Sequence, residues 1–164
     1  TDSNRPLLFR VAAGSDTAEA WLEFTGTAFE YIEGFNANGI VITPDDKYLL
    51  IVQSPTGQLY RVDTGSKEVT QVDLGSEKVM NGDGLVLDGQ TLYVVRNADQ
   101  DIAVVEMSED FSSGTVSGHL TDPAFAFPTT AAKVGNSLLV VNSQFDKMQE
   151  GTPAPFTVSS LALP

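Results

Sequence analysis

The sequence predicts an all-β protein, and more specifically part of a β-propeller. Three stretches resemble one another at spacings of 45 and then 46 residues: NGIVITPDDKYLLIVQS from Asn38, DGLVLDGQTLYVVRN from Asp83 and TTAAKVGNSLLVVNS from Thr129. Each reads as a short apolar strand, a turn and a second apolar strand, with further strands after it. Helical periodicity is almost absent. Repeats of about 45 residues with four antiparallel strands each are typical of propeller blades.

The first segment, residues 1–33, is predicted to be the end of a blade. TDSNRPLLFRV aligns with VQSPTGQLYRV at an offset of 51 residues, which matches Ser3 to Ser54 and Leu8 to Leu59. RPLLFRV is therefore expected to be a third strand and AEAWLEFTG a fourth. The sequence thus begins in the middle of a blade.

Residues 34–78 and 79–124 are predicted to be complete blades. In the first, the hairpin around TPDDK is followed by GQLYRVD and EVTQVDLG; in the second, the hairpin around LDGQ is followed by DIAVVEM and GTVSGHLT. Asp and Gly accept the backbone angles of tight turns. Residues 125–164 are predicted to be a last blade, which ends on APFTVSSLALP and lacks its closing strand.

Two, four, four and three strands make about three and a half four-stranded blades, which is half of a six-bladed propeller. Half a ring leaves open sheet edges and apolar faces. We therefore expect that about as much sequence again precedes this one in the complete protein, or that the missing N-terminal half is supplied as a second polypeptide. A second copy of this chain, joined by strand addition at the open edges, is the alternative.

Charge and composition exclude several classes of function. The net charge is −13, from 22 acidic and 9 basic residues, which argues against binding to nucleic acid or to an anionic membrane surface. No apolar run approaches the ~20 residues of a membrane span. The absence of cysteine excludes disulfides and thiolate metal sites, and His119 is the single histidine. A His-rich zinc site or a Ser-His-Asp triad is therefore not expected.

The segments NANGIVITPDDKYLLIVQSPTGQLYRVD, NGDGLVLDGQTLYVV and FPTTAAKVGNSLLVVNSQF resemble the senescence marker protein/gluconolactonase family of six-bladed propellers, in particular its bacterial secreted members. The resemblance covers nearly the whole chain but only the C-terminal half of the family's fold. It implies a secreted or periplasmic protein. It also implies a divalent cation near the mouth of the central channel, Ca²⁺ before Zn²⁺, Mg²⁺ or Mn²⁺, held by a glutamate, an asparagine and an aspartate.

Carried over by position, the resemblance makes Asn38 and Asp83 metal ligands and Asp83 the candidate catalytic base. Both occupy the same place in consecutive repeats, so both should face the axis, and their side chains offer the hard oxygen donors that such cations prefer. Thr129 is equivalent in the next repeat and is expected to hydrogen-bond a bound water. Asn36 and Asn81, two positions earlier, are candidate donors at the channel rim. The family's glutamate belongs to a blade upstream of this sequence.

A plainer interpretation of the repeated Asn-Gly and Asp-Gly pairs is that both serve only the backbone, because they are the commonest tight-turn dipeptides. The turns inside each repeat are, however, already assigned to TPDDK and LDGQ. Ser54, Asn97 and Ser143 align at the ends of the second strands, where small polar side chains are expected to satisfy backbone groups.

The resemblance implies a metal-dependent lactonase or esterase, in which the cation polarises an ester or lactone carbonyl and Asp83, or a metal-bound water, acts as base or nucleophile. The substrate would be a small molecule. Without the upstream blades the site is incomplete, so the isolated chain is expected to be inactive. The alternative is a non-catalytic propeller that binds a small molecule or a protein on its face and needs no metal. The sequence leaves open whether the complete protein is an enzyme.

Overall fold

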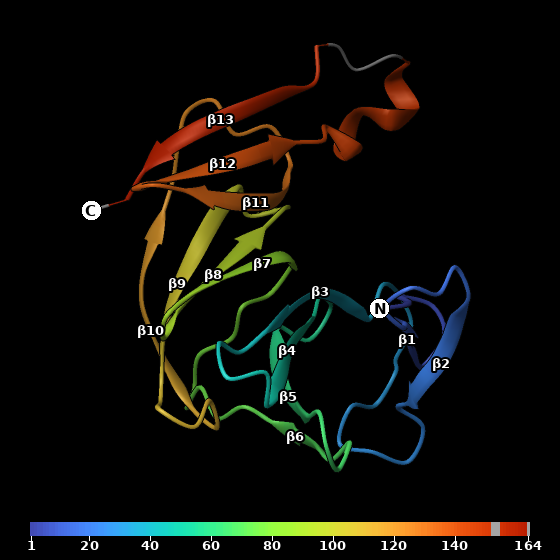
Figure 1. The fold of residues 1–164 in the computed structure, drawn as a ribbon. Coiled ribbons are helices and arrows are strands. Elements are labelled where there is room, and N and C mark those ends of the chain that lie inside the picture. Colours follow the sequence, from blue (N-terminus) through green and yellow to red (C-terminus); the bar gives the residue numbers. More distant parts are fainter. Residues whose placement is uncertain (152–154, 164) are drawn as a thin grey trace.

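The structure, a computed structural model, describes residues 1–151 and 155–163. The described residues form four antiparallel sheets that follow one another in an arc, like consecutive blades around an axis (Figure 1). In each sheet, strands that are consecutive in sequence are neighbours in space. This arrangement confirms the predicted all-β propeller fold, with sheets of two, four, four and three strands.

The strand bounds define the four sheets. The first sheet contains β1 (Leu7–Val11) and β2 (Ala18–Glu23). The second contains β3 (Ala37–Ile42), β4 (Tyr48–Gln53), β5 (Gln58–Asp63) and β6 (Val69–Gln71). The third contains β7 (Gly82–Asp88), β8 (Thr91–Arg96), β9 (Asp101–Met107) and β10 (Gly114–Leu120). The fourth contains β11 (Pro128–Val134), β12 (Ser137–Asn142) and β13 (Thr157–Ala162), with a short 3-10 helix η1 (Phe145–Glu150) before β13.

The hairpin turns between the two inner strands lie where the sequence predicts them. Asp46, Gly89 and Gly135 occupy these turns with φ values of 60°, 60° and 58°. Aspartate and glycine are residues that reach this left-handed region at low cost, which is why they mark the turns in the sequence. No helix in the described part of the chain is long and apolar enough to cross a membrane.

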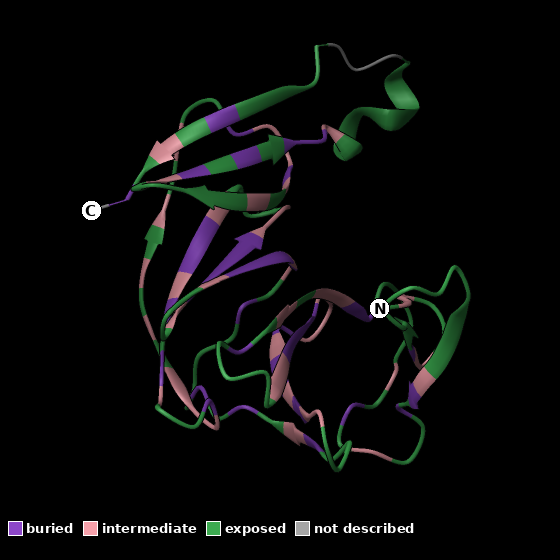
Figure 2. Ribbon diagram, viewed as in Figure 1, coloured by how far each residue is buried: buried purple, intermediate pink, exposed green. Residues whose placement is uncertain are grey.

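The core consists of three apolar clusters, each between two successive sheets. Between the first and second sheets, aromatic rings pack closely, with the ring centroids of Phe29 and Tyr60 4.3 Å apart. Leu50 and Leu92 are fully buried between the second and third sheets, and Leu138 between the third and fourth. Burying a side chain of this size contributes about 1.5–3 kcal/mol. The central strands are consequently the most buried, whereas β1, β2 and β13 are largely exposed (Figure 2).

Candidate functional site

A cavity of about 550 Å³ lies where the inner strands β3 and β7 begin. Its lining combines polar and aromatic side chains from the inner strands β3 and β7, from η1 and from segments next to the strands of all four sheets. The polar members are Ser3, Asn38, Ser54, Asn81, Asp83 and Asn97, and the aromatic members are Phe35, Phe127 and Phe145. The structure therefore brings together both predicted metal ligands, Asn38 and Asp83, in one hollow.

Each of the two predicted ligands lies at an irregularity in strand pairing. The register shifts between Ala37 and Ile40 in β3, so that Asn38 lies in a bulge, and again between Gly82 and Leu85 in β7, which places Asp83 in the equivalent bulge. Bulges bend a strand and re-aim its side chains, and they are common beside functional sites. The repeat seen in the sequence is thus a repeat of local backbone geometry.

The glycines that follow the two ligands serve packing between blades. A Cβ atom on Gly39 would lie 2.1 Å from the Asp83 carbonyl oxygen, and one on Gly84 would lie 2.5 Å from Thr130 Oγ1. Neither glycine has a positive φ, so neither pair forms a glycine-dependent tight turn. The glycines let neighbouring inner strands approach closely. The tight-turn interpretation of Asn-Gly and Asp-Gly is therefore wrong.

Hydrogen bonds orient the two ligands. Asn38 Nδ2 donates to Ser54 Oγ at 3.0 Å, and Ser54 Oγ in turn donates to the Gly82 carbonyl oxygen of the next blade. Asn97 Nδ2 donates to Asp83 Oδ2 at 3.2 Å. Because the nitrogen of Asn38 makes the bond to Ser54, its side-chain oxygen is the atom left to act as a metal ligand.

The environment of Asp83 favours its neutral form more than water does. Burial raises the pKa of the Asp83 carboxyl, while the amides of Asn97 and Asn38 oppose the shift by favouring the charged carboxylate. Among the described residues, no cationic side chain offsets this raised pKa. A bound cation would therefore stabilise the charged form of this half-buried carboxyl.

The other three predicted site residues lie in different settings. Asn81 lines the cavity, adopts a left-handed φ of 59° and donates to Asp99 Oδ2 at 2.8 Å. Asn36 is buried and closes its own loop, donating to the Ile32 carbonyl oxygen at 2.8 Å. It is not among the described residues that line the cavity, and neither is Thr129, which lies half-buried in the bulge of β11.

The residues at the ends of the second strands divide into two kinds. Ser54 and Ser143 satisfy backbone carbonyl groups, as expected, with Ser143 Oγ donating to the Phe127 carbonyl oxygen at 2.9 Å. Asn97 instead holds the Asp83 carboxylate. In the other two repeats the equivalent residue is a serine, so the sequence alignment predicted the same backbone role for Asn97.

The aromatic part of the cavity was not anticipated from the sequence. Phe127 lies at the entry to β11 with a left-handed φ of 53°, and Phe145 begins η1. Their ring centroids are 6.5 Å apart, and Phe35 adds a third ring that is 67% exposed. These residues come from loops, where no periodicity marks a side chain as facing the cavity.

A charged cluster lies at the β8–β9 turn, outside the cavity lining. Asp101 Oδ2 is 3.2 Å from Arg96 Nη1 and 3.0 Å from His119 Nδ1. Burial raises the pKa of Asp101, and the neighbouring Arg96 and His119 side chains oppose this rise. The described residues contain no group of three or more His, Asp and Glu side chains placed to hold a metal. The cluster is best explained as an ion-pair network.

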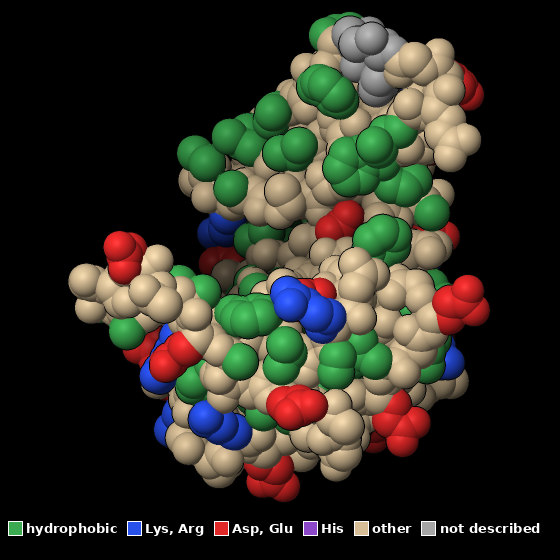
Figure 3. All heavy atoms as spheres, turned by 90° about the vertical axis from the view of Figure 1, so that its right-hand side faces the viewer, with side chains coloured by type: hydrophobic (Ala, Val, Ile, Leu, Met, Phe, Trp, Pro, Cys, Tyr) green, Lys and Arg blue, Asp and Glu red, His purple; other side chains and the backbone are tan. Residues whose placement is uncertain are grey.

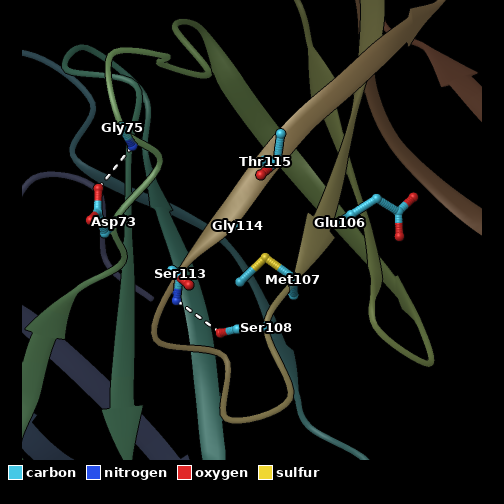
Figure 4. A pocket seen from close by; sticks show the side chains of 8 residues that line it. All are labelled: Asp73, Gly75, Glu106, Met107, Ser108, Ser113, Gly114 and Thr115. Carbon is cyan, nitrogen blue, oxygen red and sulfur yellow. Dashed lines mark hydrogen bonds between the residues drawn. The ribbon is translucent and has the colours of Figure 1, made fainter.

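A second hollow, of about 410 Å³, lies between the outer parts of the second and third sheets (Figure 4). Its polar groups are used locally: Asp73 Oδ1 accepts from the Gly75 amide at 2.8 Å, and Ser108 Oγ accepts from the Ser113 amide at 3.1 Å. The Glu106 carboxylate points away from the other lining side chains. Without convergent polar groups, this hollow is not a candidate site.

Neither a protein-family model nor a curated protein sequence matches the chain. Solved structures do, at low identity. The major allergen Mala s 1 of Malassezia sympodialis superposes with a TM-score of 0.66 and 15% identity, over 98% of this chain and 50% of that one. A candidate 6-phosphogluconolactonase of Bacteroides uniformis superposes with a TM-score of 0.55 and 12% sequence identity, over 98% of this chain and 49% of that one. A functionally unknown protein of Desulfotomaculum acetoxidans superposes with a TM-score of 0.54 and 10% sequence identity, over 100% of this chain and 51% of that one.

These similarities show the fold alone. Each neighbour is a propeller-type protein, and the chain spans about half the length of each of these three structures. The match extends over nearly all of this chain. The four sheets therefore correspond to about half of a propeller. A second structure described as a candidate 6-phosphogluconolactonase, from Bacteroides fragilis, also matches, with a TM-score of 0.53 and 12% sequence identity over 94% of this chain and 48% of that one.

Proposed function

We propose that the chain is one half of a metal-dependent, lactonase-like propeller, and that its cavity binds a divalent cation through Asn38 and Asp83. One observation carries the proposal. Two hard-oxygen side chains, placed by equivalent bulges in adjacent inner strands, meet in a single cavity. The sequence resemblance to the gluconolactonase family supports the metal, and the neighbours described as candidate lactonases support the scaffold.

The donor set fits a hard cation such as Ca²⁺ more closely than a soft one, because both ligating atoms would be oxygens. Two protein donors are fewer than the six to eight oxygens around a typical Ca²⁺. We propose that water and the remaining blades supply the rest, including the glutamate of the family pattern. Binding by the isolated half is accordingly expected to be weak.

When bound, the cation would polarise a lactone or ester carbonyl. The residues of this chain would accept a proton and keep the proposed ligands in position. Asp83 would accept a proton from the attacking water, and its raised pKa brings the carboxyl closer to the range in which a general base is efficient. Asn97 would keep the carboxylate oriented, and Ser54 would fix the amide of Asn38.

The neighbours are about twice as long as this chain, and we propose that the active ring needs the other half of the blades, whether they belong to the same polypeptide or to another. The resemblance also leads us to propose export to the periplasm or the medium. The small-molecule substrate would lie between the polar residues and the aromatic rings Phe35, Phe127 and Phe145.

Isothermal titration calorimetry tests the metal site directly. Ca²⁺, Mn²⁺ and Zn²⁺ are titrated into the wild-type chain and into the variants Asp83→Ala, Asn38→Ala and Asp16→Ala. We expect saturable binding to the wild type, with a dissociation constant on the order of 10⁻³ M or weaker, as in exposed calcium modules with few charged ligands. Asp83→Ala should abolish it and Asn38→Ala weaken it.

The Asp16→Ala variant is the matched control, because Asp16 lies in the exposed turn between β1 and β2. It removes one negative charge without touching the cavity. Equal binding by Asp83→Ala and Asp16→Ala would mean that the cation is held only by the general acidity of the surface, and the proposed site would be abandoned.

A second candidate function is a propeller that binds a neutral small molecule without catalysis. The three aromatic rings in the cavity favour it, because aromatic faces bind apolar or ring-shaped ligands without a metal. Under this alternative, ligand binding measured with EDTA present is unchanged and is lost in Phe145→Ala. Under the hydrolase proposal, EDTA weakens binding of a lactone.

A further inference from the structure

The last residue of the second strand is a sheltered polar side chain in each of the three repeats. Gln53 ends β4, Arg96 ends β8 and Asn142 ends β12. Gln53 is 1% exposed, Asn142 is 0% exposed, and the side chain of Arg96 is 13% exposed. Polar groups at such depth need hydrogen-bond partners. All three find a partner in the segment that leads into the inner strand of their own sheet.

The contacts of the second and fourth sheets use side-chain amides. Gln53 Nε2 donates to Asn36 Oδ1 at 2.9 Å, directly before β3. Asn142 Oδ1 accepts from the backbone amide of Ala126 at 3.0 Å, two residues before β11. The end of each second strand is thus tied to the entry of the inner strand beside it.

The contact in the third sheet is more extended, because its residue is an arginine. Arg96 Nε donates to the Met80 carbonyl oxygen at 3.0 Å, two residues before β7, and Arg96 Nη2 lies 2.8 Å from Asp99 Oδ2. The same Asp99 oxygen accepts from Asn81 Nδ2 at 2.8 Å. A planar guanidinium presents several donors in a fixed geometry. One side chain therefore fixes the Met80 backbone and, through Asp99, the Asn81 side chain, just ahead of Asp83.

Asn81 is linked to Asp83 by two routes. Only Gly82 separates the two residues at the start of β7, so a shift of Asn81 moves the bulge that carries Asp83. The Asn81 carbonyl oxygen also accepts from the Asn97 backbone amide at 3.2 Å, and Asn97 Nδ2 donates to Asp83 Oδ2 at 3.2 Å. Asn81 and Asn97 line the cavity, whereas Arg96 is not among the described residues that do so. Arg96 therefore acts on the cavity through these two asparagines.

Arg96 differs from the basic residues of the open surface. On the face shown in Figure 3, Lys and Arg side chains lie at the surface among acidic and apolar groups. Arg10, which pairs with Glu19, has a side chain that is 57% exposed, and exposed pairs of this kind contribute little to stability. The sheltered Arg96 loses hydration, and apolar side chains of similar volume often stabilise a fold as well as a buried ion pair does. A role in positioning explains an arginine here better than stability does.

We propose that Arg96 is a positioning residue of the cavity, which fixes Asn81 and Asn97 and, through them, the carboxyl group of Asp83. The contacts that carry this inference lie within the third sheet and the segments next to its strands. The inference deepens the proposed function and rests on it in one respect, because Asp83 is the proposed metal ligand. Its main test, however, requires no cation.

Nuclear magnetic resonance of the side-chain amides tests the proposal in the ¹⁵N-labelled chain. Arg96→Met keeps an unbranched apolar stem and removes every donor of the guanidinium. We expect the side-chain signals of Asn81 and Asn97 to move toward those of a solvated asparagine, and their protons to exchange faster with water. The side-chain signals of Asn142, which makes the equivalent contact in the fourth sheet, should stay in place.

Arg61→Met is the matched control. The Arg61 side chain is 18% exposed, and its Nη1 donates to the Asp110 carbonyl oxygen at 2.6 Å, outside the cavity lining. The variant removes the same charge and a similarly sheltered arginine. It should leave the Asn81 and Asn97 signals in place even where it lowers the Tm.

Asp99→Ala is a second variant that keeps the test decisive if Arg96→Met does not fold. The Asp99 side chain is 35% exposed and lies in the β8–β9 turn, so its removal should leave the fold intact. The variant takes away the acceptor of the Asn81 side chain. The Asn81 signals should therefore move as they do in Arg96→Met.

Cation binding gives a second readout, in which charge and position have opposite effects. Removing a positive charge by itself strengthens the binding of a cation, whereas removing the support of a ligand weakens it, by about 10-fold or more. In a Ca²⁺ titration followed by the side-chain signals of Asn38, Arg96→Met should bind about 10-fold more weakly than the wild type. Arg61→Met should not bind more weakly.

Asn81 signals that stay in place in either variant, or that move equally in Arg61→Met, would overturn the proposal and leave Arg96 with a role in stability only. Stronger Ca²⁺ binding by Arg96→Met would also overturn it, because Arg96 would then act by its charge. Signals that move in a chain that binds no cation would support the positioning role and refute only the metal site. Cation binding at Asp83 with unmoved signals would do the reverse, so the two proposals fail separately.

Discussion

At the scale of single residues, the position of Asp83 and the pKa of its carboxyl group have opposite effects on cation binding. Its place in a bulge of β7 directs a carboxyl group into the cavity, and burial there raises the pKa of that group. The charged form that binds a cation is therefore the form that burial disfavours. Residues of this kind trade stability for function.

A substitution at Asp83 should reveal how much the buried carboxylate lowers the stability of the fold. The folded chain keeps the Asp83 proton to higher pH than the unfolded chain, so its contribution to stability falls as pH rises from the ordinary carboxyl range through the raised pKa. Asp83→Asn removes that cost and can still accept the bond from Asn97. The variant should have a higher Tm than the wild type at pH 7, and the difference should vanish near pH 3.

Thermal unfolding followed by circular dichroism at several pH values measures this difference. Asp16→Asn, at an exposed position, is the control and should leave the Tm almost unchanged across the range. A variant at Asp83 that is less stable than the wild type at pH 7 would show that the carboxylate stabilises the fold, contrary to the effect of burial.

At the scale of elements, the approach of neighbouring inner strands determines the geometry of the site. β3 contacts β7, and β7 contacts β11, and the two glycines Gly39 and Gly84 let their backbones come together. The same contact sets the separation of Asn38 and Asp83, because each ligand directly precedes its glycine. Packing between blades and placement of the ligands are therefore coupled.

Adding one methyl group at Gly39 or Gly84 should disturb both the packing between blades and the placement of the ligands. Gly84→Ala would bring a Cβ to 2.5 Å from Thr130 Oγ1, and such overpacking costs about 1–3 kcal/mol of unfolding free energy. Gly118→Ala is the control, since a Cβ there meets nothing within 4 Å. Urea unfolding should show a lower midpoint for Gly39→Ala and Gly84→Ala but not for Gly118→Ala. Equal midpoints in all three would contradict the close approach.

The elements were predictable because their signals are local. Turns with Asp or Gly and short apolar strands recur at a fixed period, and the structure has strands in the predicted places. The repeat also indicated that Asn38 and Asp83 share a setting. Asn36 belongs to the same sequence pattern, yet it closes a loop through hydrogen bonds to Ile32. No local signal distinguishes a loop-closing amide from a cavity-lining one.

The aromatic side of the cavity was beyond prediction for a related reason. Phe127, just before β11, and Phe145, at the start of η1, pack against each other, and their contact depends on chain paths that carry no periodicity. Asn97 was assigned to the backbone because it aligns with two serines, and only the three-dimensional structure shows its bond to Asp83. Long-range placement of loop side chains is set by tertiary packing.

At the scale of the whole molecule, the chain is an open arc of sheets with exposed ends, and solved propellers of about twice its length contain the same arc. The cavity lies on the inner side of that arc. The net charge of −13 attracts cations to every part of the surface. A test of the site must therefore separate specific binding from this general attraction.

Nuclear magnetic resonance with Mn²⁺ makes that separation residue by residue. The paramagnetic ion broadens signals close to it, so trace Mn²⁺ added to the ¹⁵N-labelled chain reports where it binds first. We predict early loss of the side-chain amide signals of Asn38 and Asn97, and no such loss in Asp83→Ala. If broadening begins elsewhere, or persists at Asn38 in that variant, the cavity is not a metal site and the central claim is wrong.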